Sequence, residues 1–208
     1  MSYQQIKEKL SKAYSEKAVE REESKMDEWK VQERDIFLSF LNNSDTLLEI
    51  GAGTGKDGLF FKRKGHEVTC IDLSPEMVKI CSNKGLAAYE MSFDDLRFSD
   101  NSFSAVWAMN CLLHVPKQEL VNVLKEIKRV LKPGGHFFWG VYGGHDSEGI
   151  WEHDSYEPKR FFSFFSEEKV KLLGGNYFEL VSFRTLTSEQ INNPDLQFQA
   201  MIWKKESF

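Results

Sequence analysis

Apolar residues follow two different spacings along this chain, and the two alternate from about residue 45 onward. Compact apolar runs at Thr46–Ile50, Glu67–Ile71 and Phe103–Met109 are typical of buried strands. Lys56–Lys64 is expected to form a helix after the first of these runs. Lys117–Leu131 is the clearest helix, because its apolar residues share one face at a period of about 3.6. That face consists of Leu120, Val121, Leu124, Ile127, Val130 and Leu131.

Shorter signals extend the alternation to the end of the chain. Ser74 is expected to cap a helix with Pro75 in its first turn, and this helix should stop near Gly85. A later helix, Glu167–Leu173, is expected to end at Gly174-Gly175. The remaining expected strands are Ala87–Met91, His136–Tyr142, Phe178–Leu186 and Phe198–Trp203.

The segment before the first strand differs from the rest. Residues from about Gln4 to Leu41 contain no Gly or Pro and many Glu, Lys and Ala, which predicts one or two helices. Within it, Tyr14 and Trp29 are candidates to close over a ligand, although docking of the helix on the core is the favoured explanation of Trp29.

Alternating strands and helices predict a doubly wound, Rossmann-like α/β sheet of about seven strands, mostly parallel. No helix separates the last two strand-like runs, so one antiparallel edge strand is expected. With no repeat or linker in the sequence, we expect a single domain over residues 1–208. Residues 1–44 should form its helical cover and residues 45–208 its core.

Composition narrows the possible partners. A net charge of −5 without a basic stripe argues against nucleic acid as a partner. No apolar run approaches the length of about 20 residues that spans a bilayer, and a signal-peptide pattern is missing, so no membrane partner and a cytoplasmic location are expected. The three cysteines lack CxxC spacing, and no metal site is expected. The sequence leaves the oligomeric state open.

The first strand runs directly into the glycine-rich turn Gly51-Ala52-Gly53-Thr54-Gly55 and a helix. In a doubly wound sheet, ligands bind beyond the carboxyl ends of the strands, where glycines let a ligand approach the backbone. Asp72 ends the second strand, about 20 residues later, where a carboxylate can accept bonds from both hydroxyls of a ribose. Together, the turn and the acid predict a ligand that contains adenosine.

Three kinds of ligand fit such a turn. A P-loop is excluded by spacing, since Gly51 and Gly55 are separated by three residues and Lys56 is followed by Asp57. The dinucleotide pattern GxGxxG is matched by Gly53–Gly58, although it starts two residues late relative to the strand.

Glu49 favours the third ligand. A carboxylate next to the turn would repel a pyrophosphate, but it suits a positively charged ligand without phosphate, such as S-adenosylmethionine. A bracing role for Glu49 within the loop is the alternative.

Three separated motifs resemble the class I S-adenosylmethionine-dependent methyltransferases, and especially their small-molecule branch. They are Glu49–Gly55, Ile71–Met77 and Val130–Gly135, and the resemblance covers roughly Thr46 to Tyr142. It implies that the glycine turn holds the amino-acid part of the cofactor and that Asp72 holds the ribose. The cofactor contacts expected on this basis are Glu49, Gly51, Ala52, Gly53, Gly55, Asp72, Leu73, Met77, Ser92, Phe93, Asp94 and Asn110, with Tyr14 from the cover.

The resemblance also locates the reaction. The stretch Met109–Pro116 matches the part of the family that passes near the sulfonium, and His114 within it is the candidate general base. His114 bracing its own loop is the alternative. Residues after the fifth strand, namely Tyr142, His145, Asp146, His153 and Tyr156, are candidates for an acceptor pocket or for a plain surface loop.

The expected function is therefore methyl transfer from S-adenosylmethionine to an unidentified, small-molecule acceptor, leaving S-adenosylhomocysteine. A general base is needed only if the acceptor carries a proton that must be removed. Two alternatives remain at this point, an NAD-dependent oxidoreductase and a non-catalytic module that binds S-adenosylmethionine.

Overall fold

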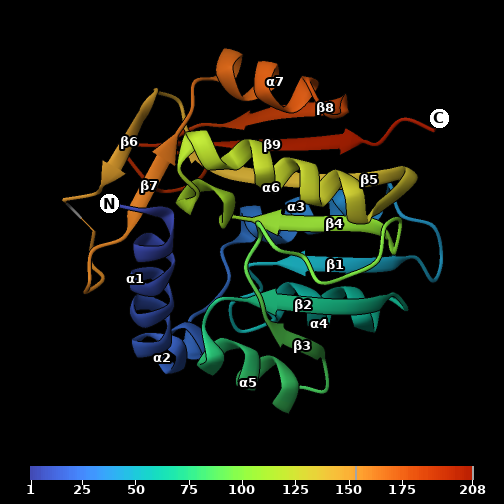
Figure 1. Cartoon of the computed structure of the whole chain (residues 1–208), viewed down its shortest axis with the longest axis horizontal. Helices are drawn as coiled ribbons and strands as arrows, with labels where there is room; N and C mark the ends of the chain where they lie inside the picture. The colour runs from blue at the N-terminus through green and yellow to red at the C-terminus, as the bar shows by residue number, and fades with distance from the viewer. Residues whose placement is uncertain (153, 208) are drawn as a thin grey trace.

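A computed structural model describes residues 1–152 and 154–207 of the chain. Its centre is a seven-stranded sheet in the order β3-β2-β1-β4-β5-β9-β8 (Figure 1). The strands of this sheet are β1 Thr46–Ile50, β2 Glu67–Asp72, β3 Ala87–Glu90, β4 Phe103–Met109, β5 Leu131–Gly143, β8 Glu179–Leu186 and β9 Gln197–Lys204. The strands β3, β2, β1, β4 and β5 pair in parallel, while β9 is antiparallel to both β5 and β8.

Helices cover both faces of the sheet. In Figure 1, α6 lies in front of the sheet, whereas α3 and α4 lie behind it. The helices are α1 Tyr3–Glu16, α2 Ala18–Glu23, α3 Glu28–Leu38, α4 Lys56–Arg63, α5 Pro75–Asn83, α6 Lys117–Val130 and α7 Glu167–Gly175, with a short 3₁₀ turn, η1, at Leu112–His114. Across the described residues, no helix combines the length and the apolar character that crossing a membrane requires.

The doubly wound, mostly parallel sheet predicted from the alternation is confirmed, including the antiparallel pairing near one edge. The strand β9 inserts between β5 and β8, a detail of order that the hydrophobic pattern does not contain. Ser74 caps α5 as expected, since its Oγ accepts a hydrogen bond from the Met77 backbone N–H at 3.2 Å. The first strand is found at the predicted bounds, with four of its five residues fully buried.

Aromatic side chains fill the core between the sheet and its helices. Trp107 of β4 stacks on Phe138 of β5 with ring centroids 4.0 Å apart, and both are fully buried. Phe37 of α3 packs against Trp107 from the same side, at 5.4 Å. Burial of rings of this size is a large part of what holds the helical cover to the sheet.

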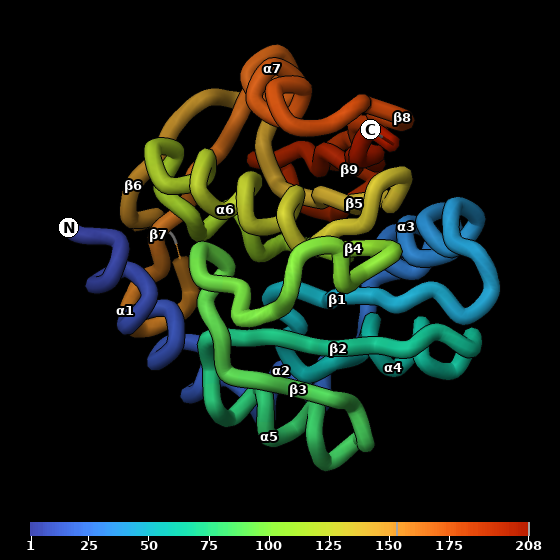
Figure 2. Tube along the Cα trace, turned by 45° about the vertical axis from the view of Figure 1, so that its right-hand side comes forward, coloured from blue at the N-terminus to red at the C-terminus, as the bar shows by residue number. Residues whose placement is uncertain are grey.

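The N-terminal segment forms three helices, not the expected one or two. The chain leaves helical geometry at Lys17 and again from Ser24 to Asp27. Ser24 and Asp27 have extended backbone angles. Figures 1 and 2 show α1 lying across one end of the sheet, beside β6 and β7. Trp29 packs on Phe198, with centroids 4.5 Å apart, so it docks α3 on the core.

A second, two-stranded sheet was not predicted. It pairs β6, Ser147–Ile150, with β7, Phe161–Phe164, in antiparallel orientation. The first strand of this hairpin has the sequence Ser-Glu-Gly-Ile and lacks apolar alternation, so periodicity gives no signal for it. In β7, Phe162 and Phe164 are buried in the hydrophobic core.

The expectation that α7 ends at Leu173 is wrong by two residues, because the helix includes Gly174 and Gly175. Gly174 faces the sheet. A Cβ atom added there would lie 2.4 Å from Cζ2 of Trp203, a fully buried ring of β9. Glycine at 174 therefore lets α7 approach the sheet more closely than any other residue would allow.

We expect Gly174→Ala to lower the free energy of unfolding by about 1–3 kcal/mol, since a rigid buried indole must shift to admit the methyl group. Urea unfolding followed by circular dichroism measures the change. Gly175→Ala is the matched control, because nothing lies within 4 Å of a Cβ atom at that position. Equal unfolding midpoints for the two variants would contradict the close packing at Gly174.

Candidate functional site

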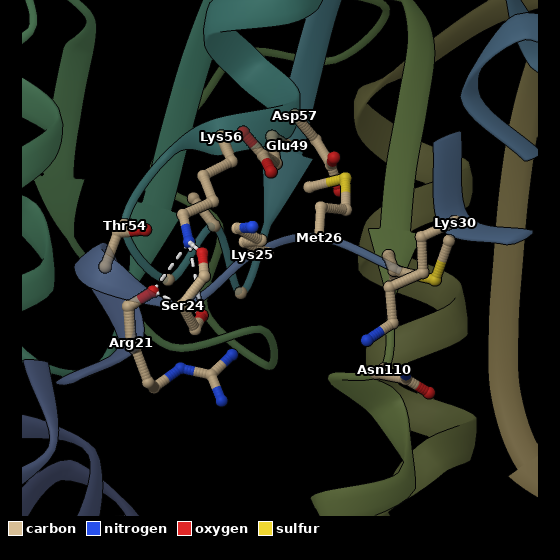
Figure 3. A pocket seen from close by; sticks show the side chains of 14 residues that line it. Arg21, Ser24, Lys25, Met26, Lys30, Glu49, Thr54, Lys56, Asp57 and Asn110 are labelled. Atoms are coloured by element: carbon tan, nitrogen blue, oxygen red, sulfur yellow. Dashed lines mark hydrogen bonds between the residues drawn. The ribbon is translucent and has the colours of Figure 1, made fainter. Parts of the chain in front are cut away.

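Two adjoining cavities lie at the carboxyl ends of β1, β2 and β4. We call them the Glu49 cavity and the Asp72 cavity. The Glu49 cavity (Figure 3) is lined by Arg21, Ser24, Lys25, Met26, Lys30, Glu49, Gly51, Ala52, Gly53, Thr54, Lys56, Asp57, Met109 and Asn110. The Asp72 cavity is lined by Leu10, Tyr14, Arg21, Gly51, Gly53, Asp72, Leu73, Phe93, Met109, Asn110, Cys111 and His114. Five residues belong to both cavities: Arg21, Gly51, Gly53, Met109 and Asn110.

The glycine turn forms the wall between these cavities. Gly51, Gly53 and Gly55 all have positive φ, at 65°, 54° and 73°, which L side chains rarely adopt. A Cβ atom at Gly51 would lie 2.3 Å from Cβ of Cys111, and one at Gly55 would lie 2.7 Å from Leu86. The turn therefore offers backbone, with no side chains of its own, to a ligand at Gly51 and Gly53.

Asp72 ties the loop after β1 to the loop after β2. Its Oδ2 accepts a hydrogen bond from the Gly53 backbone N–H at 2.8 Å, and its Oδ1 accepts one from Ser74 at 2.9 Å. Burial raises the pKa of the Asp72 carboxyl, although these two backbone bonds oppose the shift. Each oxygen retains a lone pair, so the carboxylate can also accept bonds from a ligand in the cavity.

Glu49 is buried beneath the glycine turn. Its side chain is contacted by the weak donor Sγ of Cys70 at 3.3 Å and by the backbone N–H of Gly58, and it forms no salt bridge within residues 1–152 and 154–207. Burial and the neighbouring charge of Asp57 together raise the pKa of Glu49 well above its ordinary value.

Asp57 is held differently. Its carboxylate accepts bonds from Arg34 at 3.3 Å and from Nε1 of Trp107 at 3.0 Å. Of these two neighbouring acids, Asp57 forms a salt bridge with Arg34. Glu49 forms none with the described residues.

The loop after β3 contributes less than expected. Phe93 lines the Asp72 cavity, as does Leu73 from the loop after β2. The Asp94 carboxylate, in contrast, is bound by Lys7 of α1 at 3.1 Å and by the Ser92 hydroxyl. Neither Ser92 nor Asp94 lines either cavity.

Two other expected cofactor contacts also lie outside the cavity walls. Gly55 supports the turn from below, and the Met77 side chain is fully buried in α5. Both residues shape the backbone near the cavities without lining them.

His114 and Tyr14 meet at the wall of the Asp72 cavity. The Tyr14 hydroxyl lies 2.7 Å from Nε2 of His114, and Nδ1 of His114 lies 2.7 Å from the Phe161 carbonyl oxygen. Arg160 donates to the same hydroxyl at 2.8 Å. Burial and the charge of Arg160 lower the pKa of His114 to about 3. Both ring nitrogens are therefore occupied and the ring is neutral.

The helical cover supplies cavity residues that sequence reasoning missed: Leu10, Arg21, Met26 and Lys30. Figure 3 shows Lys30 extending toward Asn110, with the Arg21 guanidinium on the same side of the cavity. These residues belong to segments in which charged side chains are common, so no pattern separates them from solvent-exposed neighbours.

The described residues of the segment after β5 line neither the Glu49 cavity nor the Asp72 cavity. His145 and Asp146 are exposed, and Asp146 pairs with Lys117 at 2.6 Å. Tyr156 accepts a bond from Arg21 at 3.0 Å, and His153 lies outside the described residues. Residues 1–152 and 154–207 contain no cluster of three or more His, Cys, Asp or Glu that would suit a metal ion.

Known proteins match the central part of this chain. Residues 48–139 match the model of a methyltransferase domain. The chain is 37% identical over 95 residues to the demethylmenaquinone methyltransferase of Tropheryma whipplei, which covers 44% of this chain and 39% of that protein. It is 37% identical over 99 residues to the ubiquinone biosynthesis O-methyltransferase of Xanthomonas oryzae pv. oryzae, covering 44% and 41%. The chain thus matches about two fifths of the length of these curated relatives.

A solved structure resembles nearly the whole chain. The 1,6-didemethyltoxoflavin-N1-methyltransferase of Burkholderia thailandensis, which holds 1,6-didemethyltoxoflavin and S-adenosylhomocysteine, matches with a TM-score of 0.79 at 19% identity. The match covers 99% of this chain and 91% of that one, and it establishes the fold. The family match thus shows a methyltransferase domain at residues 48–139, and the solved structure shows the fold of nearly the whole chain.

Proposed function

We propose that this protein transfers a methyl group from S-adenosylmethionine to a small organic acceptor. The observation that carries the proposal is the meeting of the Glu49 and Asp72 cavities at Gly51, Gly53 and Asn110. One cavity offers a carboxyl without a cation and the other a carboxylate suited to ribose hydroxyls. This division fits a ligand with an amino acid at one end and adenosine at the other.

The residues fit the two ends of the cofactor as follows. Asp72 would accept bonds from the ribose hydroxyls, with Leu73 and Phe93 against the adenosine. Glu49 would hold the ammonium group of the amino-acid end, and Arg21 its carboxylate. Asn110 supports this placement, because it lines both cavities and its buried Oδ1 has no hydrogen-bond partner among the described residues.

The bound cofactor supplies a methyl group on a positively charged sulfur, which an acceptor can attack directly. The protein would contribute mainly position, which is worth up to about 7–11 kcal/mol in favourable cases. His114, the expected general base, is a weak base here, since its pKa is lowered to about 3 and its Nε2 already contacts Tyr14. We therefore assign His114 to holding Tyr14 in place.

The small-molecule acceptor is supported by the relatives. All three compared proteins are named for reactions on small organic molecules. In this chain, Leu10, Tyr14 and Arg21 of the helical cover lie against the cavities, so an acceptor has to fit beneath α1 and α2.

No observation on the described residues favours an NAD-dependent oxidoreductase or a non-catalytic binding module. The Gly53–Gly58 match to the dinucleotide pattern begins beside the buried Glu49, whose carboxylate would repel the pyrophosphate of NAD. The single-domain organisation, the cytoplasmic location and the absence of a nucleic-acid partner stay predictions from the sequence. The oligomeric state remains open.

We expect Asp72→Ala to weaken the binding of S-adenosylhomocysteine by about 10- to 150-fold, because charge-assisted bonds to the ribose are lost (about 1.5–3 kcal/mol). Calorimetric titration measures the affinity, and the same titration with NAD tests the oxidoreductase alternative. Since Asp72 also binds Gly53 and Ser74, thermal unfolding must show that the variant is folded.

The matched control is Asp95→Ala, an exposed acid close by in sequence that lines neither cavity. An unchanged dissociation constant in folded Asp72→Ala would place the ribose elsewhere. Binding of NAD, with none of S-adenosylhomocysteine, would overturn the proposed cofactor.

We also expect S-adenosylhomocysteine to release a proton from Glu49 on binding. Without a ligand, the raised pKa keeps Glu49 protonated in the pH range between its ordinary value and the raised one. An ammonium group beside it lowers that pKa, so the proton leaves and affinity rises with pH across this range.

Titrations at about pH 6 in buffers of different ionisation enthalpy measure the release as a buffer-dependent binding enthalpy. Glu49→Gln is the matched variant, since it keeps the shape of the side chain but has no proton to release. Binding enthalpies that are the same in all buffers for the unmodified protein would separate Glu49 from the ammonium group.

A further inference from the structure

Three segments that are far apart in sequence meet at the hydroxyl group of Tyr14. Tyr14 belongs to α1, His114 to the end of η1, and Arg160 directly precedes β7. His114 Nε2 lies 2.7 Å and Arg160 Nη1 2.8 Å from the hydroxyl oxygen. Figures 1 and 2 both show α1 beside the β6–β7 hairpin, which makes this meeting possible.

The direction of each hydrogen bond at this junction is fixed by chemistry. The Phe161 carbonyl can only accept, so Nδ1 of His114, 2.7 Å away, must carry the proton of the ring. Because the ring is neutral, Nε2 is then an acceptor, and the Tyr14 hydroxyl must donate to it. Arg160 has only donors, so the Tyr14 oxygen accepts from Arg160.

This count leaves the Tyr14 oxygen with one free lone pair and no free proton. Any ligand group that contacts the oxygen must therefore donate a hydrogen bond, and an electron-rich group there is repelled. Tyr14 and His114 both line the Asp72 cavity. The ring of Tyr14 also lies 5.2 Å from the guanidinium of Arg21, which lines both cavities. The Tyr14 ring thus lies beside a residue that the two cavities share.

Arg160 is fixed in this position by its own partners. Its guanidinium makes two bonds to the buried Asp154, at 2.7 and 2.9 Å. It also stacks on the ring of Tyr156, 3.6 Å from the centroid. These contacts hold Arg160 so that its Nη1 donates to the Tyr14 hydroxyl. Its Nε and Nη2 donate to Asp154.

On the basis of the proposed function, we infer that Tyr14 discriminates between the cofactor and its product. Its hydroxyl oxygen would contact the sulfur or the methyl group bound to it. S-adenosylmethionine carries a methyl group there, whose hydrogens are polarised by the positive sulfur and act as weak donors. S-adenosylhomocysteine has a thioether sulfur with lone pairs instead. An acceptor-only oxygen favours the first and disfavours the second, so Tyr14 is a specificity-determining residue and Arg160 a positioning residue.

The test uses sinefungin, which has a carbon atom bearing an amino group in place of the sulfonium, so that N–H donors stand where the methyl group would be. We expect the protein to bind sinefungin more tightly than S-adenosylhomocysteine in calorimetric titrations. Tyr14→Phe should lower this preference by about tenfold or more while leaving the affinity for S-adenosylhomocysteine unchanged or higher. Tyr89→Phe, an exposed tyrosine of β3, is the matched control and should keep the preference.

A second variant reverses the polarity without removing Tyr14. In His114→Leu, the Tyr14 hydroxyl loses its acceptor and can donate to the ligand, so the preference should move toward S-adenosylhomocysteine. Arg160→Lys should keep more of the original preference than Arg160→Met, because lysine retains a charged donor. Long-range ¹⁵N NMR of His114 should show the proton on Nδ1 in the unmodified protein.

The outcomes separate this inference from the proposed function. If neither ligand binds the unmodified protein, the proposed function fails. If both bind but Tyr14→Phe weakens them equally, or the unmodified protein has no preference, Tyr14 has only a structural role and the inference is overturned.

Discussion

The carboxylate of Asp72 is the constraint on which the rest of the site depends. It binds one backbone N–H from the glycine turn and one from the loop that begins α5, and so fixes two strand ends to each other. Together with the Ala52 N–H, which donates to the Ile71 carbonyl of β2 at 3.0 Å, this link sets the distance between the turn and β2. The same carboxylate faces the Asp72 cavity. One partly buried carboxylate thus helps to set the geometry of the turn and also offers a ligand contact.

Two buried acids, Glu49 and Asp57, lie at the Glu49 cavity and have different partners. Asp57 is neutralised by Arg34 of α3 and by Trp107, so it anchors the helical cover to the core. Glu49 has no such partner among the described residues, and burial makes its ionisation costly. A charged ligand group can remove that cost, whereas it would gain little at Asp57. The cavity therefore contains one acid for structure and one that a cation stabilises.

Sequence reasoning succeeded where one residue type has a local cause. Glycines at positive φ, a serine at a helix start and apolar periods all reflect short-range physics, and β1, the cap at Ser74 and Asp72 were found in this way. Arg21 and Arg160 were not foreseen, because their roles come from partners over a hundred residues away. Ser92 and Asp94 resemble the family motif, yet Lys7 from α1 binds the Asp94 carboxylate, and no local pattern contains that pairing.

The attachment of α1 explains why the cover is the least predictable part of the site. Lys7, Ser11 and Ser15 recur at every fourth position and bind Asp94, the Leu73 carbonyl and the Ser74 hydroxyl. This stripe is polar, so a search for apolar periodicity overlooks it. Leu10 and Tyr14 lie on the adjacent face and line the cavity. Ile6, Leu10 and Ala13 of the same helix are buried, so apolar packing holds α1 in place beside these polar bonds. The polar and apolar contacts together place Tyr14 at the wall of the Asp72 cavity.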